Sequence, residues 1–141
     1  MSVGLLLITH NEIGAALLAT VTRMLGSCPL RARALEVTDE ADRDALSATA
    51  AGLVTELDEG DGVLVLTDIF GSSPANIAGS LQGRPQVLAL AGVNLPMLVR
   101  VFNYPGLPLD ALAEKALSAG QAGVMACRRP GSPVSPEAGG S

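Results

Sequence analysis

The sequence predicts an α/β domain with an open, mainly parallel sheet and helices on both of its faces. Two observations support this prediction. Strand-like and helix-like segments alternate along the chain, and most of the strand-like segments are short apolar runs without polar alternation. Such runs are typical of strands buried on both faces, and their alternation with helices is typical of parallel crossover connections.

The predicted strands are five short segments rich in Leu, Val, Ile and Ala. The first is the continuous run Val3 to Ile8. Turn residues precede two of the others: Gly60-Asp61-Gly62 comes before the third segment, and Gly83-Arg84-Pro85 comes before the fourth. In chain order the predicted strands cover residues 3–8, 32–37, 63–67, 87–91 and 124–127.

The predicted helices are segments in which apolar residues recur at helical spacing. The first ends before Gly26, a typical stop signal, and Thr38-Asp39 is the expected cap of the second. The third and fourth begin with a polar cap followed closely by proline, at Ser73-Pro74 and at Asn94-Leu95-Pro96. In chain order the predicted helices cover residues 12–25, 40–57, 74–81, 95–102 and 109–119.

Length and composition exclude several classes of protein. The chain has 141 residues, which predicts one domain over residues 1–127 and a disordered tail, rich in Pro, Gly and Ser, over residues 128–141. A net charge of −5 and the absence of a basic stripe argue against nucleic acid as a partner. No apolar run is long enough to cross a bilayer and no signal peptide is visible, so we expect a cytoplasmic protein that does not insert into a membrane. One histidine and two distant cysteines, Cys28 and Cys127, offer no metal site, and we expect both thiols to be reduced.

Chemistry-bearing residues follow three of the predicted strands. Thr9-His10-Asn11 comes after the first strand, Asp68 and Gly71-Ser72-Ser73-Pro74 come after the third, and Gly92-Val93-Asn94 comes after the fourth. In open parallel sheets, sites form outside the carboxyl ends of the strands, where the strand order reverses. The only histidine, an aspartate and two helix starts are therefore expected at one edge of the sheet.

His10 is the candidate nucleophile. An uncharged imidazole nitrogen can attack phosphorus near neutral pH, and the resulting N–P bond keeps a high transfer potential, which suits a relay. A carboxylate such as Asp68 would fix the imidazole tautomer and stabilise the imidazolium that forms during transfer. The alternative interpretations are a histidine without chemistry and an aspartate that only caps a helix or turn.

Ser73, Ser72 and Gly71 form the candidate phosphate-binding loop. Ser73 is expected to cap the helix, and free N–H groups with the helix dipole make such a start a ready anion site. A plain helix cap is the alternative. Asn94, which repeats the pattern, and Thr9, which precedes His10, complete the candidate set. No nucleotide-binding motif or Mg²⁺-type carboxylate cluster is present, so no cofactor is expected and the phosphoryl donor would be another phosphoprotein.

Three segments resemble the mannose-family IIA components of the phosphoenolpyruvate-dependent sugar phosphotransferase system. They are VLVLTDIFGSSPANIA at residues 63–78, AGVNLPML at residues 91–98, and LITH at residues 7–10. The resemblance covers about residues 1–127. It implies a parallel sheet with one antiparallel edge strand and a homodimer. It also implies phosphorylation of His10 by the phosphocarrier HPr and transfer to a IIB component, with Asp68 as the histidine's hydrogen-bond partner and Ser73 in the phosphate pocket.

The sequence departs from the family pattern at two places and leaves other functions open. Asn11 stands where the family often has glycine, and Gly71-Ser72 stands where it has paired glycines. The phosphotransfer subunit of a phosphoenolpyruvate-dependent dihydroxyacetone kinase is similar, although residues 93–97 favour the mannose type. A regulatory module that reports the phosphorylation state of His10 is a second alternative. A flavodoxin-like ligand-binding domain is a third, disfavoured by an aromatic content of 2%.

Overall fold

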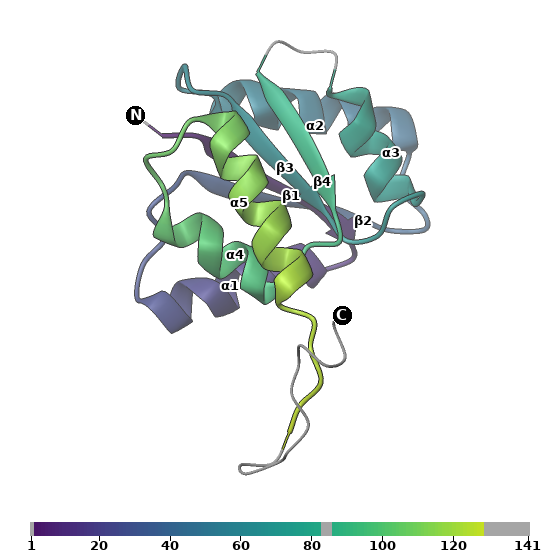
Figure 1. The fold of residues 1–141 in the computed structure, drawn as a ribbon. Helices are drawn as coiled ribbons and strands as arrows, with labels where there is room; N and C mark the ends of the chain where they lie inside the picture. The colour runs from purple at the N-terminus through teal and green to yellow at the C-terminus, as the bar shows by residue number, and fades with distance from the viewer. Residues whose placement is uncertain (1, 83–85, 129–141) are drawn as a thin grey trace.

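The computed structural model describes residues 2–82 and 86–128 of the chain. Strands and helices alternate through most of this part, as Figure 1 shows. The strands are β1 (Gly4–His10), β2 (Ala32–Val37), β3 (Val63–Thr67) and β4 (Val87–Ala91). The helices are α1 (Ile13–Leu25), α2 (Arg43–Leu57), α3 (Ser73–Ser80), α4 (Leu95–Asn103) and α5 (Leu109–Ala122).

The four strands form one parallel sheet in the order β2-β1-β3-β4. Within the sheet, β2 lies on one side of β1, whereas β3 and β4 lie on the other side of β1. The strand order therefore reverses between β1 and β3, whose carboxyl ends lie next to each other: Ile8 is in register with Thr67, and His10 with Val37 of β2. A crevice at such a reversal is the usual place for a site in this type of fold.

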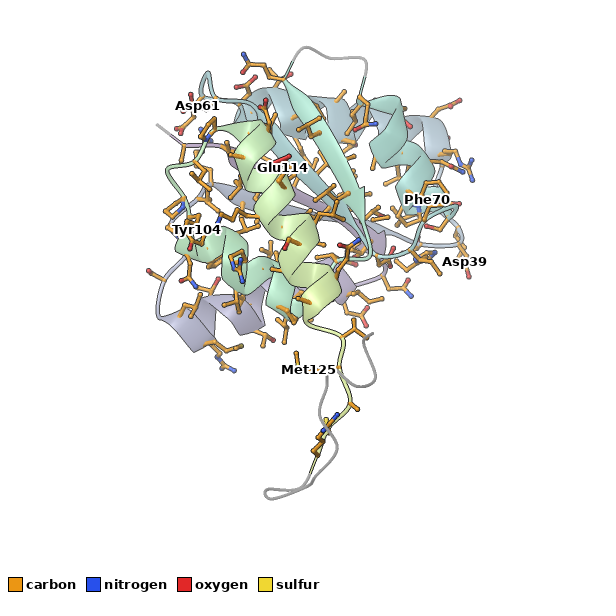
Figure 2. The ribbon with its side chains drawn as sticks, viewed as in Figure 1. Asp39, Asp61, Phe70, Tyr104, Glu114 and Met125 are labelled. Carbon is orange, nitrogen blue, oxygen red and sulfur yellow. The ribbon has the colours of Figure 1, made fainter. Side chains whose placement is uncertain are left out.

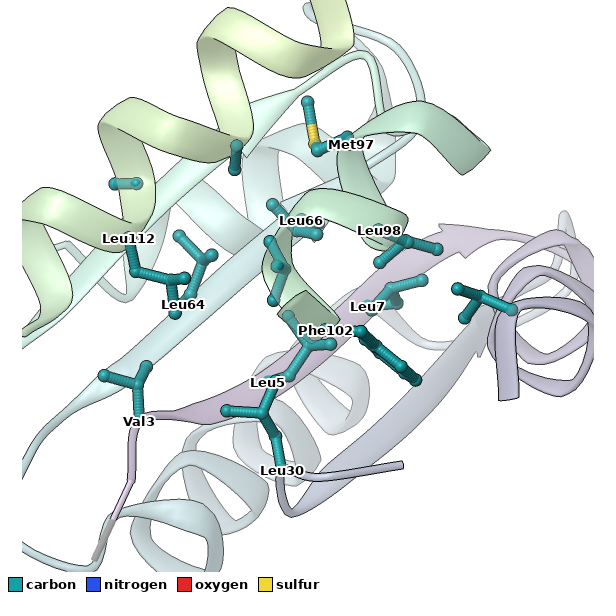
Figure 3. Packing of buried hydrophobic residues seen from close by; sticks show 14 residues of the cluster. Val3, Leu5, Leu7, Leu30, Leu64, Leu66, Met97, Leu98, Phe102 and Leu112 are labelled. Atoms are coloured by element: carbon teal, nitrogen blue, oxygen red, sulfur yellow. The ribbon is translucent and has the colours of Figure 1, made fainter. Parts of the chain in front are cut away.

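Helices cover both faces of the sheet. α1, α4 and α5 lie on one face, and α2 and α3 lie on the other (Figure 1). Successive residues of each central strand point to opposite faces of the sheet and so pack alternately into the two helix layers. Leu5 and Leu7 of β1 join the core under α4 and α5, where Figure 3 shows them with Leu98 and Phe102. Ile8 packs instead under α2 and α3. His10, two residues further along β1, is thus directed to the α2/α3 side.

The predicted fold class is confirmed, and β2, β3 and β4 have the predicted bounds. The prediction ended β1 too early: the strand continues to His10, because β2 is long enough to pair with it there. The predicted start of α2, at residue 40, was also wrong. The helix begins at Arg43, and its cap is Asp42, whose Oδ1 accepts the N–H of Asp44 at 3.0 Å, so the Thr38-Asp39 segment stays in the preceding loop.

The predicted last strand, residues 124–127, is not a strand in the described part of the chain. Residues 124–128 have no regular structure and lead away from the end of α5, so they have no neighbouring strand to pair with (Figure 1). The sheet described here is wholly parallel, and the antiparallel edge strand implied by the resemblance is absent from it. The predicted turn at residues 83–85 lies outside the described residues, as does the predicted tail apart from Arg128.

Two further features concern the length of the helices and the state of the cysteines. Within residues 2–82 and 86–128, no helix combines the length and the apolar character needed to cross a membrane. Cys28 and Cys127 are both free and exposed.

Candidate functional site

The side chains of His10 and Asp68 meet where β1 and β3 end. The backbone N–H of His10 donates to Asp68 Oδ2 at 2.9 Å, and His10 Nδ1 lies 2.9 Å from the same oxygen. The other carboxylate oxygen, Oδ1, accepts the backbone N–H of Ile69 at 2.9 Å. The Asp68 side chain is 14% exposed and that of His10 is 40% exposed. The aspartate is therefore fixed by three donors, while part of the imidazole remains open to solvent.

This geometry assigns the tautomer of His10. An ionised carboxylate only accepts hydrogen bonds, so the proton between Nδ1 and Oδ2 belongs to the imidazole. Nε2 then carries the lone pair and is the nitrogen free to act as a nucleophile. When a group adds to Nε2 and the ring becomes cationic, Asp68 faces the developing charge.

The pKa of Asp68 shows that its charged form is favoured. Burial by itself would raise the pKa of this carboxyl. The N–H groups of His10, backbone and side chain, the positive charge of its ring when protonated, and the amide of Ile69 together outweigh burial and hold the pKa below its ordinary value of 3.8. Asp68 is therefore ionised at neutral pH, as a partner of an imidazole N–H must be.

The loop between Asp68 and α3 turns sharply at Gly71. Its φ of +84° lies in the left-handed region, which glycine adopts without steric cost. Ser72 then caps α3: its hydroxyl accepts the N–H of Ala75 at 3.4 Å and donates to the carbonyl of Ile69 at 2.6 Å. The expectation that Ser73 is the cap was wrong by one residue, because α3 already begins at Ser73. Its hydroxyl is consequently not used for capping.

A cavity of about 170 Å³ opens beside His10 on the α2/α3 side of the sheet. Ser73 lies on one wall and accepts a hydrogen bond from Arg43 Nη2 at 2.8 Å. The complete lining consists of residues from β1, the β2–α2 connection, α2 and α3, namely His10, Val37, Thr38, Asp39, Ala41, Arg43, Leu46, Ser73 and Ile77. In the described ranges, no group of three or more His, Cys, Asp or Glu side chains could hold a metal ion.

Two predicted site residues are bonded elsewhere. The buried hydroxyl of Thr9 accepts the N–H of Gly14 at 2.7 Å and so fixes the start of α1. Asn94 caps α4: its Oδ1 accepts the N–H of Met97 at 2.9 Å, and its Nδ2 donates to the carbonyl of Gly120 at 3.0 Å. The structure brings His10, Asp68 and the start of α3 together, whereas Thr9 and Asn94 do not line the cavity.

Sequence reasoning missed the contribution of the β2–α2 connection, which includes Thr38 and Asp39, and that of Arg43. A signal was available, because the rule for parallel strand ends also applies to the segment after β2. In the order β2-β1-β3-β4, β2 is next to β1, so the segment after β2 must flank whatever follows β1. The position of Arg43 had no local signal, since its partner Ser73 is 30 residues away.

The backbone conformation of Asn11 explains why asparagine can stand where the family often has glycine. Its φ is +49°, and it is the one non-glycine residue with positive φ in the described part of the chain. Its N–H donates to the carbonyl of Val37 at 3.0 Å. Asparagine tolerates the left-handed conformation better than other residues with a Cβ, so it can replace a glycine at this turn.

Comparison with known proteins places this geometry in a family. Residues 4–117 match the family described as "PTS system fructose IIA component", where PTS denotes the phosphotransferase system. No match is found among curated protein sequences.

Solved structures agree with that match. The mannose/sorbose-specific IIA subunit of the phosphotransferase system from Enterococcus faecalis is 29% identical, with a TM-score of 0.82 over 92% of this chain and 98% of that chain. A putative phosphotransferase-system permease from Klebsiella pneumoniae is 25% identical, with a TM-score of 0.75 over 90% and 92%. The IIA protein associated with the fucose utilization operon of Streptococcus pneumoniae, 24% identical, shares the fold with a TM-score of 0.77 over 89% and 96%.

These findings confirm the resemblance to mannose-type IIA components that the three sequence segments predicted. Because the match extends over residues 4–117, the chain belongs to the IIA family of the sugar phosphotransferase system, whose place is in phosphoryl transfer during sugar uptake.

Proposed function

We propose that the protein is a phosphohistidine relay that accepts a phosphoryl group from phospho-HPr on His10 and passes it to a IIB component. The observation that carries the proposal is the hydrogen bond between His10 Nδ1 and Asp68, which leaves Nε2 as the nucleophile beside an open cavity. Membership of the IIA family supports HPr and IIB as the partners and the cytoplasm as the place of action.

The transfer step needs only groups that this chain and its donor supply. Nε2 of His10 attacks phosphorus as the bond between phosphorus and the donor nitrogen breaks, and the electron pair of that bond returns to the donor imidazole. The Nδ1 proton stays on the ring, where Asp68 stabilises the cationic phosphoimidazole. The reverse sequence of bond changes delivers the phosphoryl group to the acceptor, so no cofactor enters the cycle.

The surroundings of His10 favour a protein as the donor. Ile69 is 60% exposed and Phe70 is 87% exposed, in the loop that directly follows Asp68. Figure 2 shows Phe70 projecting from the surface near the carboxyl ends of the strands. Ile13, at the start of α1, is also exposed. Apolar side chains around a reactive histidine suit a complementary protein surface, since a small-molecule substrate would leave them in water.

We further propose that the chain acts as a homodimer. Val124 is 78% exposed and Met125 is 66% exposed, in the segment that leaves α5 (Figure 2). Within the described residues β4 has a strand neighbour on one side only. A second copy of the chain would cover such surfaces. Sedimentation of the full chain at micromolar concentration should give the mass of a dimer, and a monomer would contradict this part of the proposal.

The relay is tested by incubating the protein with phosphoenolpyruvate, enzyme I and HPr. Mass spectrometry should find an acid-labile phosphate on His10, and omission of HPr should abolish it. Chasing the purified phosphoprotein with a IIB domain should transfer the phosphate. A chase that instead loads only the ADP-binding subunit of a dihydroxyacetone kinase would assign the chain to that system. A protein that takes up no phosphate would refute the relay.

A further inference from the structure

Arg43 reaches the candidate phosphoryl site from a different helix than the one that carries Ser73. It is the first residue of α2, it lines the cavity together with His10, and its Nη2 donates to Ser73 Oγ at 2.8 Å. A guanidinium has five N–H donors in one plane. The contact with Ser73 uses one of them, so the others remain available to a group that enters the cavity.

Arg43 forms no ion pair with another described residue. Arg31 and Arg33 each form an ion pair, with Glu59 at 3.3 Å and with Glu56 at 2.6 Å. Arg43 has no carboxylate oxygen within 4.0 Å among residues 2–82 and 86–128, and its side-chain partner there is a neutral hydroxyl. An arginine in this state favours an anion, because planar N–H pairs match the oxygens of a phosphoryl group.

The contact also sets the role of the Ser73 hydroxyl. Since this oxygen accepts a hydrogen bond from Arg43, its own O–H is free to donate to another acceptor. The start of α3 also presents the positive end of its helix dipole, although Pro74 has no N–H and the N–H of Ala75 already donates to Ser72. Asp39, which also lines the cavity, adds negative charge that would oppose an anion. Arg43 is the permanent cation that offsets it.

We propose that Arg43 binds the phosphoryl group on His10 Nε2 and presents the Ser73 hydroxyl to the same group. This inference rests on the proposed relay and adds a residue to its site. Two guanidinium N–H groups meet phosphoryl oxygens while the phosphorus moves between nitrogens. Arg43 gives up no proton and forms no covalent bond; it balances the negative charge of the three oxygens in the transition state.

The test compares four forms of the full chain: wild type, Arg43→Ala, Arg43→Lys and Arg33→Ala. Arg33→Ala is the matched control, because it removes one arginine charge from the surface without touching the cavity. Each form is phosphorylated by phosphoenolpyruvate, enzyme I and HPr, with kcat and KM for phospho-HPr measured separately. Thermal unfolding checks that the fold is kept, and the ³¹P resonance of phosphorylated His10 reports contacts to the phosphate.

We expect Arg43→Ala to lower kcat roughly 10- to 100-fold, the size of a lost hydrogen bond to a charged group. KM should change less, Arg43→Lys should recover part of the rate, and the ³¹P resonance should shift in Arg43→Ala but not in Arg33→Ala. Arg43→Ala transfer within twofold of the wild-type rate, with an unchanged resonance, would overturn the inference and leave the relay standing. If the wild type itself takes up no phosphate, the relay fails instead.

Discussion

The starts of α3 and α4 look alike in sequence but differ in what the fold leaves open. Both follow a parallel strand, both have a polar cap with a proline just after it, and both caps bond to a backbone N–H of the first turn. At α4 the cap residue Asn94 is also tied to the carbonyl of Gly120, so α5 closes that helix start. At α3 the cap is Ser72, which leaves the next residue, Ser73, facing a cavity.

The difference teaches that a capping pattern predicts a helix start but not its accessibility. Accessibility depends on which helix packs over the strand end. Among the described residues β4 is an edge strand, and its carboxyl end lies under α5. β3 lies next to β1, where the reversal of strand order keeps a crevice open. Chemistry is therefore expected at α3, and a structural role at α4.

The largest expected effect comes from removing the nucleophile at the open helix start. His10→Ala should abolish phosphate uptake from phospho-HPr, because the chain has no second histidine. Both helix starts should remain folded, so circular dichroism should match the wild type. If mass measurement of the intact His10→Ala variant found phosphate at any site, the assignment of phosphoryl transfer to this end of the sheet would be wrong.

Asp68→Asn should slow phosphoryl transfer by at least roughly 10- to 100-fold, the cost of losing a carboxylate that orients a metal-bound histidine. An amide in place of the carboxylate permits either tautomer of His10, so the nucleophilic nitrogen is free only part of the time. Single-turnover transfer from phospho-HPr measures the effect. A rate equal to that of the wild type would reduce Asp68 to a structural residue.

Ser73→Ala and Asn94→Ala form a matched pair that sharpens the comparison directly. Ser73→Ala should lower the transfer rate several-fold, about the value of one hydrogen bond, with little change in stability. Asn94→Ala should lower the free energy of unfolding by about 1–2 kcal/mol, because a cap is lost, and should leave transfer nearly unchanged. Urea unfolding and transfer assays on both variants test these roles. If Ser73→Ala lowered stability and Asn94→Ala lowered transfer instead, the assignment of chemistry to α3 and of structure to α4 would be contradicted.

The smallest expected effect is the pH dependence of stability. The pKa of Asp68 is lower in the folded chain than its ordinary value of 3.8, so its ionised form stabilises the fold above that pH. This contribution should disappear as the pH falls below 3.8 through the folded pKa. The difference in unfolding free energy between wild type and Asp68→Asn should thus shrink as the pH falls below about 4. A difference that grows as the pH is lowered further from 4 would contradict the assigned hydrogen bonds.

Local sequence patterns predicted most of the fold, because apolar runs and helical spacing depend on neighbours in the chain. The meeting of His10 with Asp68, 58 residues apart, was also predictable, since it follows from the rule for parallel strand ends. The Arg43–Ser73 contact was not, because it depends on how α2 sits against α3. The segment 124–127 has the composition of a strand, yet a strand also needs a neighbour, and composition does not supply one.

The left-handed residues Asn11 and Gly71 limit how this protein can vary in evolution. One directly follows His10 and the other lies three residues after Asp68, with φ values of +49° and +84°. A Cβ at Gly71 would meet no atom within 4 Å, so the restriction there comes from the backbone and not from crowding. Valine, isoleucine or threonine at either position would strain the turn that carries a reacting group. Substitutions accepted at these two positions should therefore be confined to glycine, asparagine and aspartate, even where the surface is open to water.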